Sequence, residues 1–210
     1  MTETAIEYLS KKDYRLARVI ETIGPLPYYE PSDPFRFLVY EIIGQMLSDK
    51  VREVIIARFV RLCEDSITPK HILTIDLHQM SLCGMSMRKC ISIRDLAASI
   101  QEHRIDLDSL AYMSDDEVIR ILTQIKGIGP WTSKMFLLFF LMREDILPVE
   151  DAAFMQSFKW LYGYKNPSTD TVIKRCSKWR PFSSTASRYM YRALDNGLTK
   201  IPLNEFLKNF

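Results

Sequence analysis

Apolar residues recur at helical spacing along most of the chain. The clearest stripe comprises Phe35, Leu38, Val39, Ile42, Ile43, Met46 and Leu47. Intervals of three and four residues place such side chains on one face of an amphipathic α-helix. Asp33 and Pro34 directly precede the stripe, and they are typical of a capping residue and a first helical position. The pattern therefore predicts a helix that begins at about residue 34.

The same reasoning predicts further helices, and no alternating stretch is long enough to indicate a strand. A capping box, Ser114 with Glu117, opens a short helix, and Pro130 is typical of the first position of an apolar one. The expected helices cover residues 51–62, 87–100, 114–122, 130–142, 152–162, 169–178 and 183–196. The sequence therefore predicts an all-α protein.

Composition narrows the class of protein. Only 7 of the 210 residues are glycine, which argues against a β-sandwich or barrel because those folds need many tight turns. The four cysteines show no CxxC spacing, as expected of reduced thiols in an intracellular protein. The three histidines form no HExxH-like set, so we expect no zinc. The longest apolar run, 135–142, falls far short of the ~20 residues of a membrane span.

Charge is distributed unevenly along the chain. Residues 1–151 contain 18 Lys and Arg against 23 Asp and Glu, a net charge of −5, whereas residues 152–210 contain 10 against 3, a net charge of +7. The basic segment also contains many aromatic residues, and clustered cations among aromatics suit a polyanion-binding surface. A solvated helix face explains the charges equally well, so charge alone leaves both readings open.

Two short segments carry candidate chemistry. Gly127 and Gly129 lie between two predicted helices, where a Gly-x-Gly turn and the next helix N-terminus can present amides to a DNA phosphate. About twenty residues further on, Glu150 and Asp151 begin a new helix, where a carboxylate is favoured. Taken singly, the glycines also fit a plain helix–helix turn, and Asp151 also fits a simple N-cap.

Taken together, the Gly-x-Gly hairpin, the apolar helix and the Leu147-Pro148-x-x-Asp151 segment resemble the helix-hairpin-helix DNA glycosylase superfamily. Segments 37–48, 81–89 and 178–184 also match, so the resemblance runs from about residue 34 to 196. Among the branches, the chain is most similar to 3-methyladenine DNA glycosylase II, the alkylation-repair type. The resemblance implies one domain, 1–210, of two helical lobes with an active-site cleft between them: 34–147 as one lobe, 1–33 with 148–210 as the other.

The resemblance also implies roles for particular residues. Asp151 would stabilise the positive charge that develops on the sugar and align the attacking water, with Glu150 as the competing carboxylate. Base flipping is implied, with Met46 after Gln45 as the wedge, although Met46 also completes the helix stripe. The base pocket would include Trp131, Tyr191 and Met135. The DNA-binding set would be Gln45, Met46, Gly127, Gly129 and Lys134.

Cofactor expectations follow from the same resemblance. The hairpin would hold a sodium or potassium ion through the backbone carbonyls of Thr123, Ile125 and Ile128, although no cofactor is required. Relatives with an iron–sulfur cluster carry four cysteines near the C-terminus, where this chain has only Cys176, so we expect no cluster. Trp131 occupies the position of the Schiff-base lysine of bifunctional relatives, so we expect no strand cleavage.

The sequence therefore predicts a monofunctional DNA glycosylase that hydrolyses the N-glycosidic bond of alkylated purines, of the 3-methyladenine and 7-methylguanine type, in base excision repair. Its partner would be double-stranded DNA containing damaged bases, and we expect a monomer that works in a bacterial cytoplasm or nucleoid, or in a eukaryotic nucleus. One alternative is excision of deaminated or oxidised bases such as hypoxanthine, because Ala152 implies a wider pocket. Another is a non-catalytic helix-hairpin-helix module that only binds DNA.

Overall fold

The computed structural model describes residues 3–27 and 31–208, and within those ranges every regular element is a helix. The all-α prediction is confirmed. Contacts between residues divide the chain into two compact units: Met1–Glu30 with Met142–Phe210, called here the terminal unit, and Pro31–Leu141, the central unit.

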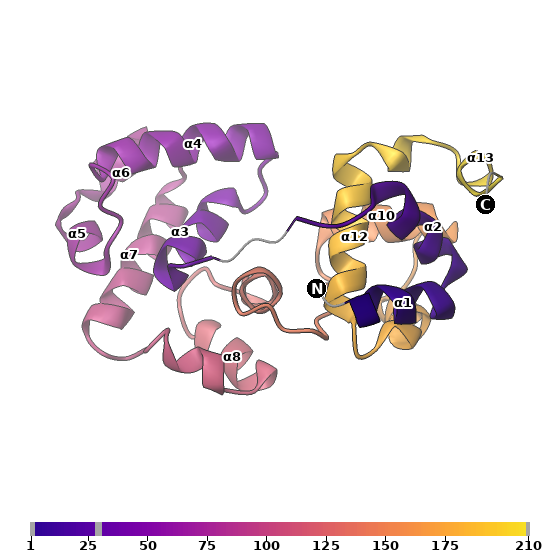
Figure 1. Ribbon diagram of the computed structural model, residues 1–210. Coiled ribbons are helices and arrows are strands. Elements are labelled where there is room, and N and C mark those ends of the chain that lie inside the picture. Colours follow the sequence, from indigo (N-terminus) through magenta and orange to yellow (C-terminus); the bar gives the residue numbers. More distant parts are fainter. Residues whose placement is uncertain (1–2, 28–30, 209–210) are drawn as a thin grey trace. The chain divides into compact units, whose positions relative to one another are not determined.

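The central unit is built around α7 (Met87–Gln101), which packs against α3, α5 and α6 (Figure 1). Its other elements are α3 (Pro34–Gly44), α4 (Asp49–Leu62), α5 (Pro69–Thr74), α6 (Leu77–Leu82), η1 (Ser109–Tyr112), α8 (Asp115–Leu122), α9 (Pro130–Met135) and the π-helical turn η2 (Phe136–Phe140). Apolar faces of these helices meet at fully buried residues such as Leu38, Phe59 and Phe136. Burial of these faces is the main favourable contribution to folding of the unit.

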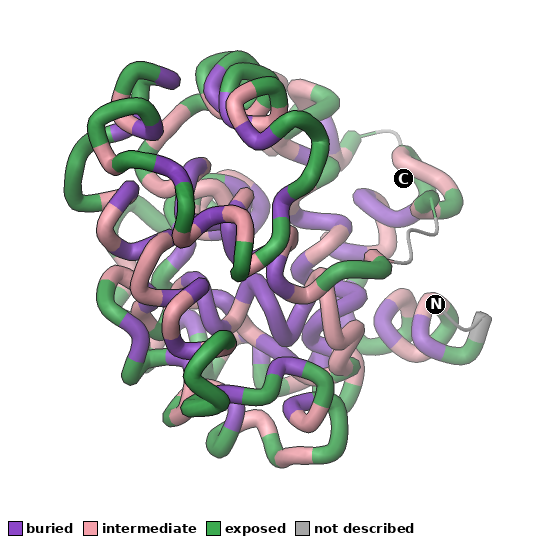
Figure 2. The backbone as a smooth tube through the Cα atoms, turned by 90° about the vertical axis from the view of Figure 1, so that its left-hand side faces the viewer, coloured by how far each residue is buried: buried purple, intermediate pink, exposed green. Residues whose placement is uncertain are grey.

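The terminal unit joins the two ends of the chain. In it α12 packs against α10 and α2, and α1 packs against α2. Its elements are α1 (Glu3–Lys12), α2 (Tyr14–Ile23), α10 (Ala152–Tyr162), α11 (Thr169–Cys176), η3 (Ser177–Trp179), α12 (Ser183–Asp195), η4 (Leu198–Lys200) and α13 (Leu203–Leu207). The sequence patterns did not predict α1 and α2, whose apolar residues complete this core at Leu9, Leu16 and Val19. Figure 2 shows buried and exposed positions alternating along the helical turns of the chain, as amphipathic helices require.

Local capping signals were predicted correctly. Asp33 is the N-cap of α3, where its carboxylate accepts a 2.9 Å hydrogen bond from the Arg36 amide, and Pro34 occupies the first position. Ser114 and Glu117 form a reciprocal capping box at α8. These signals depend only on neighbours within four residues, so they are legible without tertiary information.

The single helix predicted over 130–142 was wrong in detail. After α9 the chain widens into η2, where the Leu141 amide donates to the carbonyl of Phe136 at 2.9 Å, and Met142 then takes a positive φ of 56°. The Phe136 and Phe140 rings stack at 4.8 Å, and both contact Phe37. Aromatic packing against α3 therefore accompanies the extra residue in the turn.

The contact boundary lies at Leu141–Met142, whereas the predicted lobe ran to residue 147. The segment that follows Met142 bonds to the start of α12: the Ser184 amide donates to the Glu144 carbonyl at 3.0 Å, and the Ile146 amide donates to Ser184 Oγ at 2.9 Å. These bonds place residues 144–147 with the terminal unit. Whether the whole chain acts as one glycosylase domain remains a prediction.

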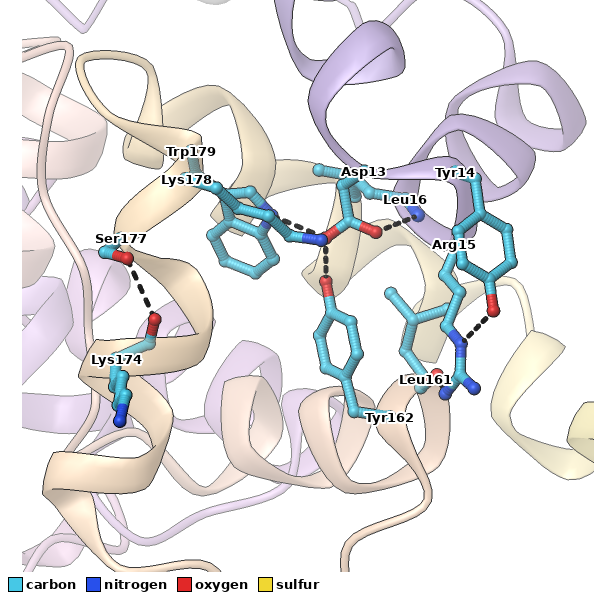
Figure 3. A network of polar contacts seen from close by, with 10 residues as sticks. All are labelled: Asp13, Tyr14, Arg15, Leu16, Leu161, Tyr162, Lys174, Ser177, Lys178 and Trp179. Atoms are coloured by element: carbon cyan, nitrogen blue, oxygen red, sulfur yellow. Dashed lines mark hydrogen bonds and ion pairs between the residues drawn. The ribbon is translucent and has the colours of Figure 1, made fainter.

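One buried carboxylate joins three elements of the terminal unit. Asp13 caps α2, and its Oδ2 accepts hydrogen bonds from Tyr162 Oη and from Trp179 Nε1 at 3.1 Å and an ion pair from Lys178 Nζ at 3.0 Å (Figure 3). Burial would raise the pKa of Asp13, but the hydrogen bonds from Tyr162, Lys178 and Trp179 outweigh it and lower the pKa below its usual value. The cluster therefore holds a charge in the core by satisfying it completely.

Candidate functional site

Asp151 is the N-cap of α10, as its position after Pro148 suggested. Its Oδ1 accepts a 2.7 Å hydrogen bond from the Phe154 amide, and only 8% of the residue is exposed. The backbone at Asp151 is relaxed, with φ −84° and ψ 126°. Capping and a reactive role are compatible, because an N-cap bond holds one carboxylate oxygen in a fixed direction. Glu150, by contrast, is exposed.

The loop that leads into Asp151 is anchored on the first turns of α12. Glu144 and Ile146 of this loop bond to Ser184, as described above. Between them, Asp145 accepts hydrogen bonds from Arg180 Nε at 2.7 Å and from Ser183 Oγ at 2.5 Å. The Asp151 amide then donates to the Pro148 carbonyl at 3.0 Å. The small serines allow the loop backbone to lie directly against the helix. The position of the carboxylate is therefore set by α12 as well as by its own helix.

The Gly-x-Gly segment is a tight connection between α8 and α9. Gly127 has φ 84°, a left-handed conformation that favours glycine, and a Cβ there would lie 2.8 Å from the Cβ of Ser92. Gly129 has φ −107°, and a Cβ there would have no neighbour within 4 Å. Only Gly127 is thus required by the fold of the central unit. Gly129 leaves the backbone open on its outer side.

The hairpin backbone retains donors and acceptors. Among the described residues no group accepts from the amides of Gly127 and Gly129, and none donates to the carbonyls of Thr123 and Ile128. The Ile125 carbonyl accepts one bond, at 3.1 Å from the Ile128 amide. Amides turned outward at the start of a helix form an anion site, and converging carbonyls suit a hard cation.

Three side chains on one face of α7 support this hairpin and the turn after α3. Ser92 packs against Gly127, and Asp95 Oδ2 accepts a 2.8 Å hydrogen bond from the Lys126 amide. One turn earlier on the same face, Lys89 Nζ donates to the carbonyls of Ile43 and Gln45, both at 2.8 Å. The sequence analysis missed these contacts because polar residues at i, i+3 and i+6 resemble any solvated helix face.

Gln45 and Met46 form the turn between α3 and α4. Gln45 Nε2 donates to the Gly127 carbonyl at 2.9 Å and to Thr132 Oγ1 at 3.0 Å. Met46 has φ 59° and a completely exposed side chain, which rules out its completing the buried stripe of α3. A left-handed residue other than glycine costs about 1–2 kcal/mol, and such strain is concentrated at functional sites.

The remaining predicted site residues are divided between the units. Trp131 and Lys134 are half-buried on α9, and Met135 is 4% exposed in the central core. Tyr191 is half-buried on α12 and packs against the terminal core. Core packing accounts for much of the Met135 environment. The pocket roles of Trp131, Tyr191 and Met135 stay predictions.

None of the helices in the described part of the chain is long and apolar enough to cross a membrane. No group of three or more His, Cys, Asp or Glu side chains within the described ranges could hold a metal ion. The four cysteines are buried thiols, and burial raises the pKa of Cys63 to about 11.

Two helices joined by a Gly-x-Gly turn, whose glycine amides no described residue accepts from, define a helix-hairpin-helix protein, and the capping aspartate adds a candidate reactive group. The chain belongs to the HhH-GPD superfamily of base excision DNA repair proteins, whose family model matches residues 39–181. The family resemblance drawn from the sequence is confirmed.

Individual relatives cover nearly the whole chain. A DNA-3-methyladenine glycosylase of Schizosaccharomyces pombe is 31% identical over 192 residues, which are 88% of this chain and 84% of that protein. A solved structure of the 3-methyladenine DNA glycosylase from the same yeast, in complex with abasic DNA, has a TM-score of 0.85 and 30% identity and covers 91% of this chain and 97% of that one. A DNA-3-methyladenine glycosidase of Bacillus halodurans has a TM-score of 0.81 and 30% identity over 97% and 95%.

Proposed function

We propose that this protein is a monofunctional DNA glycosylase that hydrolyses the N-glycosidic bond of alkylated purines in duplex DNA, the first step of base excision repair. The observation that carries the proposal is Asp151, a buried carboxylate held in a defined direction at the N-terminus of α10 in a chain of the HhH-GPD superfamily. Relatives named 3-methyladenine DNA glycosylases support the substrate class.

Hydrolysis of the N-glycosidic bond of an alkylated purine requires few protein groups besides one carboxylate. A purine alkylated on a ring nitrogen is cationic, so it leaves with the electron pair of the C1′–N bond and becomes neutral. The sugar then carries oxocarbenium-like positive charge, which Asp151 stabilises. Water adds to C1′ through its oxygen and gives up a proton, for which Asp151 is the nearest acceptor in this scheme. No separate acid is needed to protonate the leaving base.

DNA binding is assigned to the hairpin and its neighbours. In this proposal the amides of Gly127 and Gly129, from which no described residue accepts, donate hydrogen bonds to a phosphate oxygen, and Lys134 in the last turn of α9 adds positive charge. Such contacts release counterions, so affinity should fall as salt rises. A salt-independent affinity for duplex DNA would remove the hairpin from this role.

Base flipping is assigned to the turn after α3. Met46 is completely exposed, and its thioether fills the gap left by the base without requiring a hydrogen-bond partner. Gln45 beside it is bonded to the hairpin and so joins the wedge to the phosphate contact. The flipped cationic base would meet the ring faces of Trp131 and Tyr191, which attract it by about 0.5–2 kcal/mol through cation–π interaction, and Met135 would fill space beside them.

An alkali ion fits the hairpin carbonyls. Thr123 and Ile128 offer carbonyls that accept no hydrogen bond from the described residues, and the Ile125 carbonyl has a lone pair left after its bond to the Ile128 amide. Sodium or potassium bound there would neutralise the negative ends of these peptides beside a phosphate. The chain would use the ion to stiffen the turn and would need none for the reaction itself.

Release of free bases from methylated duplex DNA tests the function. We expect the wild type to release 3-methyladenine and 7-methylguanine, and Asp151→Asn to lose activity by about 100-fold or more, as typical for removal of one acid–base group. Glu150→Gln is the matched control and should keep wild-type activity. Equal activity of wild type and Asp151→Asn would overturn the assigned role, and reversed behaviour of the two variants would transfer it to Glu150.

The same assay decides between substrates and modes of action. Release of hypoxanthine in preference to alkylated purines would favour the alternative substrate class, for which the exposed Ala152 leaves room. Tight DNA binding with no base release would favour a pure binding module. Borohydride should trap no covalent complex, since Trp131 has no amine. We also propose that the protein acts as a monomer in the compartment that holds genomic DNA. Light scattering of its complex with duplex DNA measures the number of protein copies per duplex, and we expect one.

A further inference from the structure

The turn after α3 has an unusual backbone. Gln45 has φ −49° and ψ 126°, Met46 has φ 59°, and the Leu47 amide donates to the Gly44 carbonyl at 3.1 Å. These angles define a type II turn, whose third position requires positive φ and is ordinarily occupied by glycine or asparagine. Met46 occupies that position without burying its side chain. Something other than Met46 must therefore hold the turn.

Lys89 hydrogen-bonds to the carbonyl oxygen of Gln45 in this turn. Its Nζ donates to the Gln45 carbonyl, which belongs to the central peptide of the turn, and to the Ile43 carbonyl in the last turn of α3, each at 2.8 Å. Type I and type II turns differ mainly by a flip of that central peptide. A donor fixed on the Gln45 oxygen therefore selects type II and imposes positive φ on the next residue. The side chain of Lys89 is half-buried, so its ammonium is kept in place by α7.

The other end of Gln45 is fixed as well. Its side-chain amide donates to the Gly127 carbonyl and to Thr132 Oγ1. The residue before Met46 is thus held through its carbonyl by Lys89 and through its side chain by the hairpin. Two independent restraints on one residue leave the direction of the Met46 side chain determined by α7 and the hairpin together.

We propose that Lys89 is a positioning residue: by holding the Gln45–Met46 peptide in the type II orientation, it sets the direction in which the Met46 thioether projects. Lys89 acts through Met46 and contacts no substrate. Its consequence for repair rests on the proposed function, because only a DNA-inserting Met46 makes that direction matter. The conformational part does not depend on DNA.

The conformational part is tested by comparing glycine with alanine at position 46. Positive φ favours glycine and negative φ favours alanine. With Lys89 present, Met46→Gly should therefore have a higher Tm than Met46→Ala. Lys89→Met removes the ammonium group and keeps an aliphatic side chain. In this background we expect the turn to relax to type I, so that Met46→Gly no longer has a higher Tm than Met46→Ala.

Two further backgrounds make this result specific. Lys89→Arg retains donors and should preserve the preference for glycine. Arg88→Met removes the neighbouring exposed cation and should also preserve it. A preference for glycine that survives Lys89→Met, or one that is absent with Lys89 intact, would overturn the proposal even if the protein proved to be a different enzyme.

The functional part is tested by a double-mutant cycle of single-turnover base release from duplex DNA. Lys89→Met and Met46→Ala should each slow release by about 10- to 100-fold, the scale of a small misplacement. The double variant should be no slower than the slower single variant. Losses that multiply would show that Lys89 does not act through Met46, and an unaffected Met46→Ala variant would also overturn this part.

A substrate with a lower flipping cost supplies the final check. An alkylated purine opposite an abasic nucleotide has no partner to give up, so less work is asked of the wedge. The deficit of Lys89→Met should shrink on this duplex, whereas a general loss of folding would slow both substrates equally. An inactive wild type would instead contradict the proposed function, and the glycine–alanine comparison would still decide the conformational part.

Discussion

The two units differ in the backbone conformation that positions their candidate functional residues. In the terminal unit, Asp151 lies on a relaxed N-cap, and the loop before it is fixed by hydrogen bonds to the serines of α12. In the central unit, Gly127 and Met46 have positive φ, and side chains of α7 hold the turns that contain them. The terminal unit holds its group with ordinary backbone angles, and the central unit holds its groups on left-handed residues.

This difference follows from the two tasks proposed for them. A carboxylate that stabilises developing charge needs a fixed direction, which a helix N-terminus supplies with ordinary angles. Binding of a phosphate by the hairpin needs backbone amides that point to solvent. Insertion into DNA needs a side chain that points away from the core of the unit. Both require unusual backbone conformations, and such conformations persist only when neighbouring groups restrain them.

The two units also differ in how they treat their aspartate N-caps. The terminal unit buries the charged Asp13 and satisfies it with three side-chain donors. The central unit packs apolar faces around α7, pairs its buried Glu41 with the half-buried Arg52, and keeps the aspartate cap Asp33 exposed. Loss of one buried partner should therefore damage the terminal unit more than loss of an equivalent cap damages the central unit.

Asp13→Ala is expected to have the largest effect on stability. It leaves Tyr162 and Trp179 each with a buried donor and Lys178 with a half-buried charge, and it should cost about 3–5 kcal/mol, the range for breaking a buried charge pair. Asp33→Ala removes an N-cap of the same residue type and should cost about 1 kcal/mol. Urea unfolding of both variants measures the difference, and equal costs would erase the contrast between the two units.

Gly127→Ala should have the next largest effect, because it combines positive φ with a clash against Ser92. We expect a loss of about 2–3 kcal/mol from overpacking and strain together with weaker DNA binding. Gly129→Ala should change stability by about 0.5 kcal/mol or less, as for other sites without contacts. Thermal unfolding and DNA titration of the pair would show whether the two glycines serve fold and access separately.

Ser184→Ala tests the anchoring of the loop that leads into Asp151. Loss of the bond from the Ile146 amide should cost about 1 kcal/mol and lower kcat, with little change in the affinity for DNA. Ser168→Ala removes an N-cap of similar strength at α11 and should destabilise without lowering kcat. Single-turnover kinetics of the two variants distinguish them, and a parallel fall in kcat would mean that α12 does not position Asp151.

The smallest effect concerns pH. Because the pKa of Asp13 is lowered in the folded protein from its usual 3.8, its contribution to stability is complete above that value and is lost as pH falls through the folded pKa. The wild type should therefore lose more stability than Asp13→Asn between about pH 5 and pH 2. Urea midpoints across this range provide the test, and identical slopes would contradict a charged Asp13.

Much of the fold was predictable because its signals are local. Helical stripes and the caps at Asp33 and Ser114 depend on residues within a few positions. The π-helical turn after Met135 and the helices α1 and α2 were not predicted. The π-helical turn depends on the stacked rings of Phe136 and Phe140, which contact Phe37. Helices α1 and α2 complete a core that residues from the distant end of the chain supply.

The sequence by itself determined the family, the hairpin glycines and the aspartate at the start of α10, because each is a short motif whose chemistry is carried by neighbours in the chain. Only the tertiary structure decided how these motifs are held. Lys89 reaches the Gln45 carbonyl and Ser184 reaches the Ile146 amide across more than thirty residues. No periodicity records such pairs, because a hydrogen bond depends on distance and direction in space and not on separation along the chain.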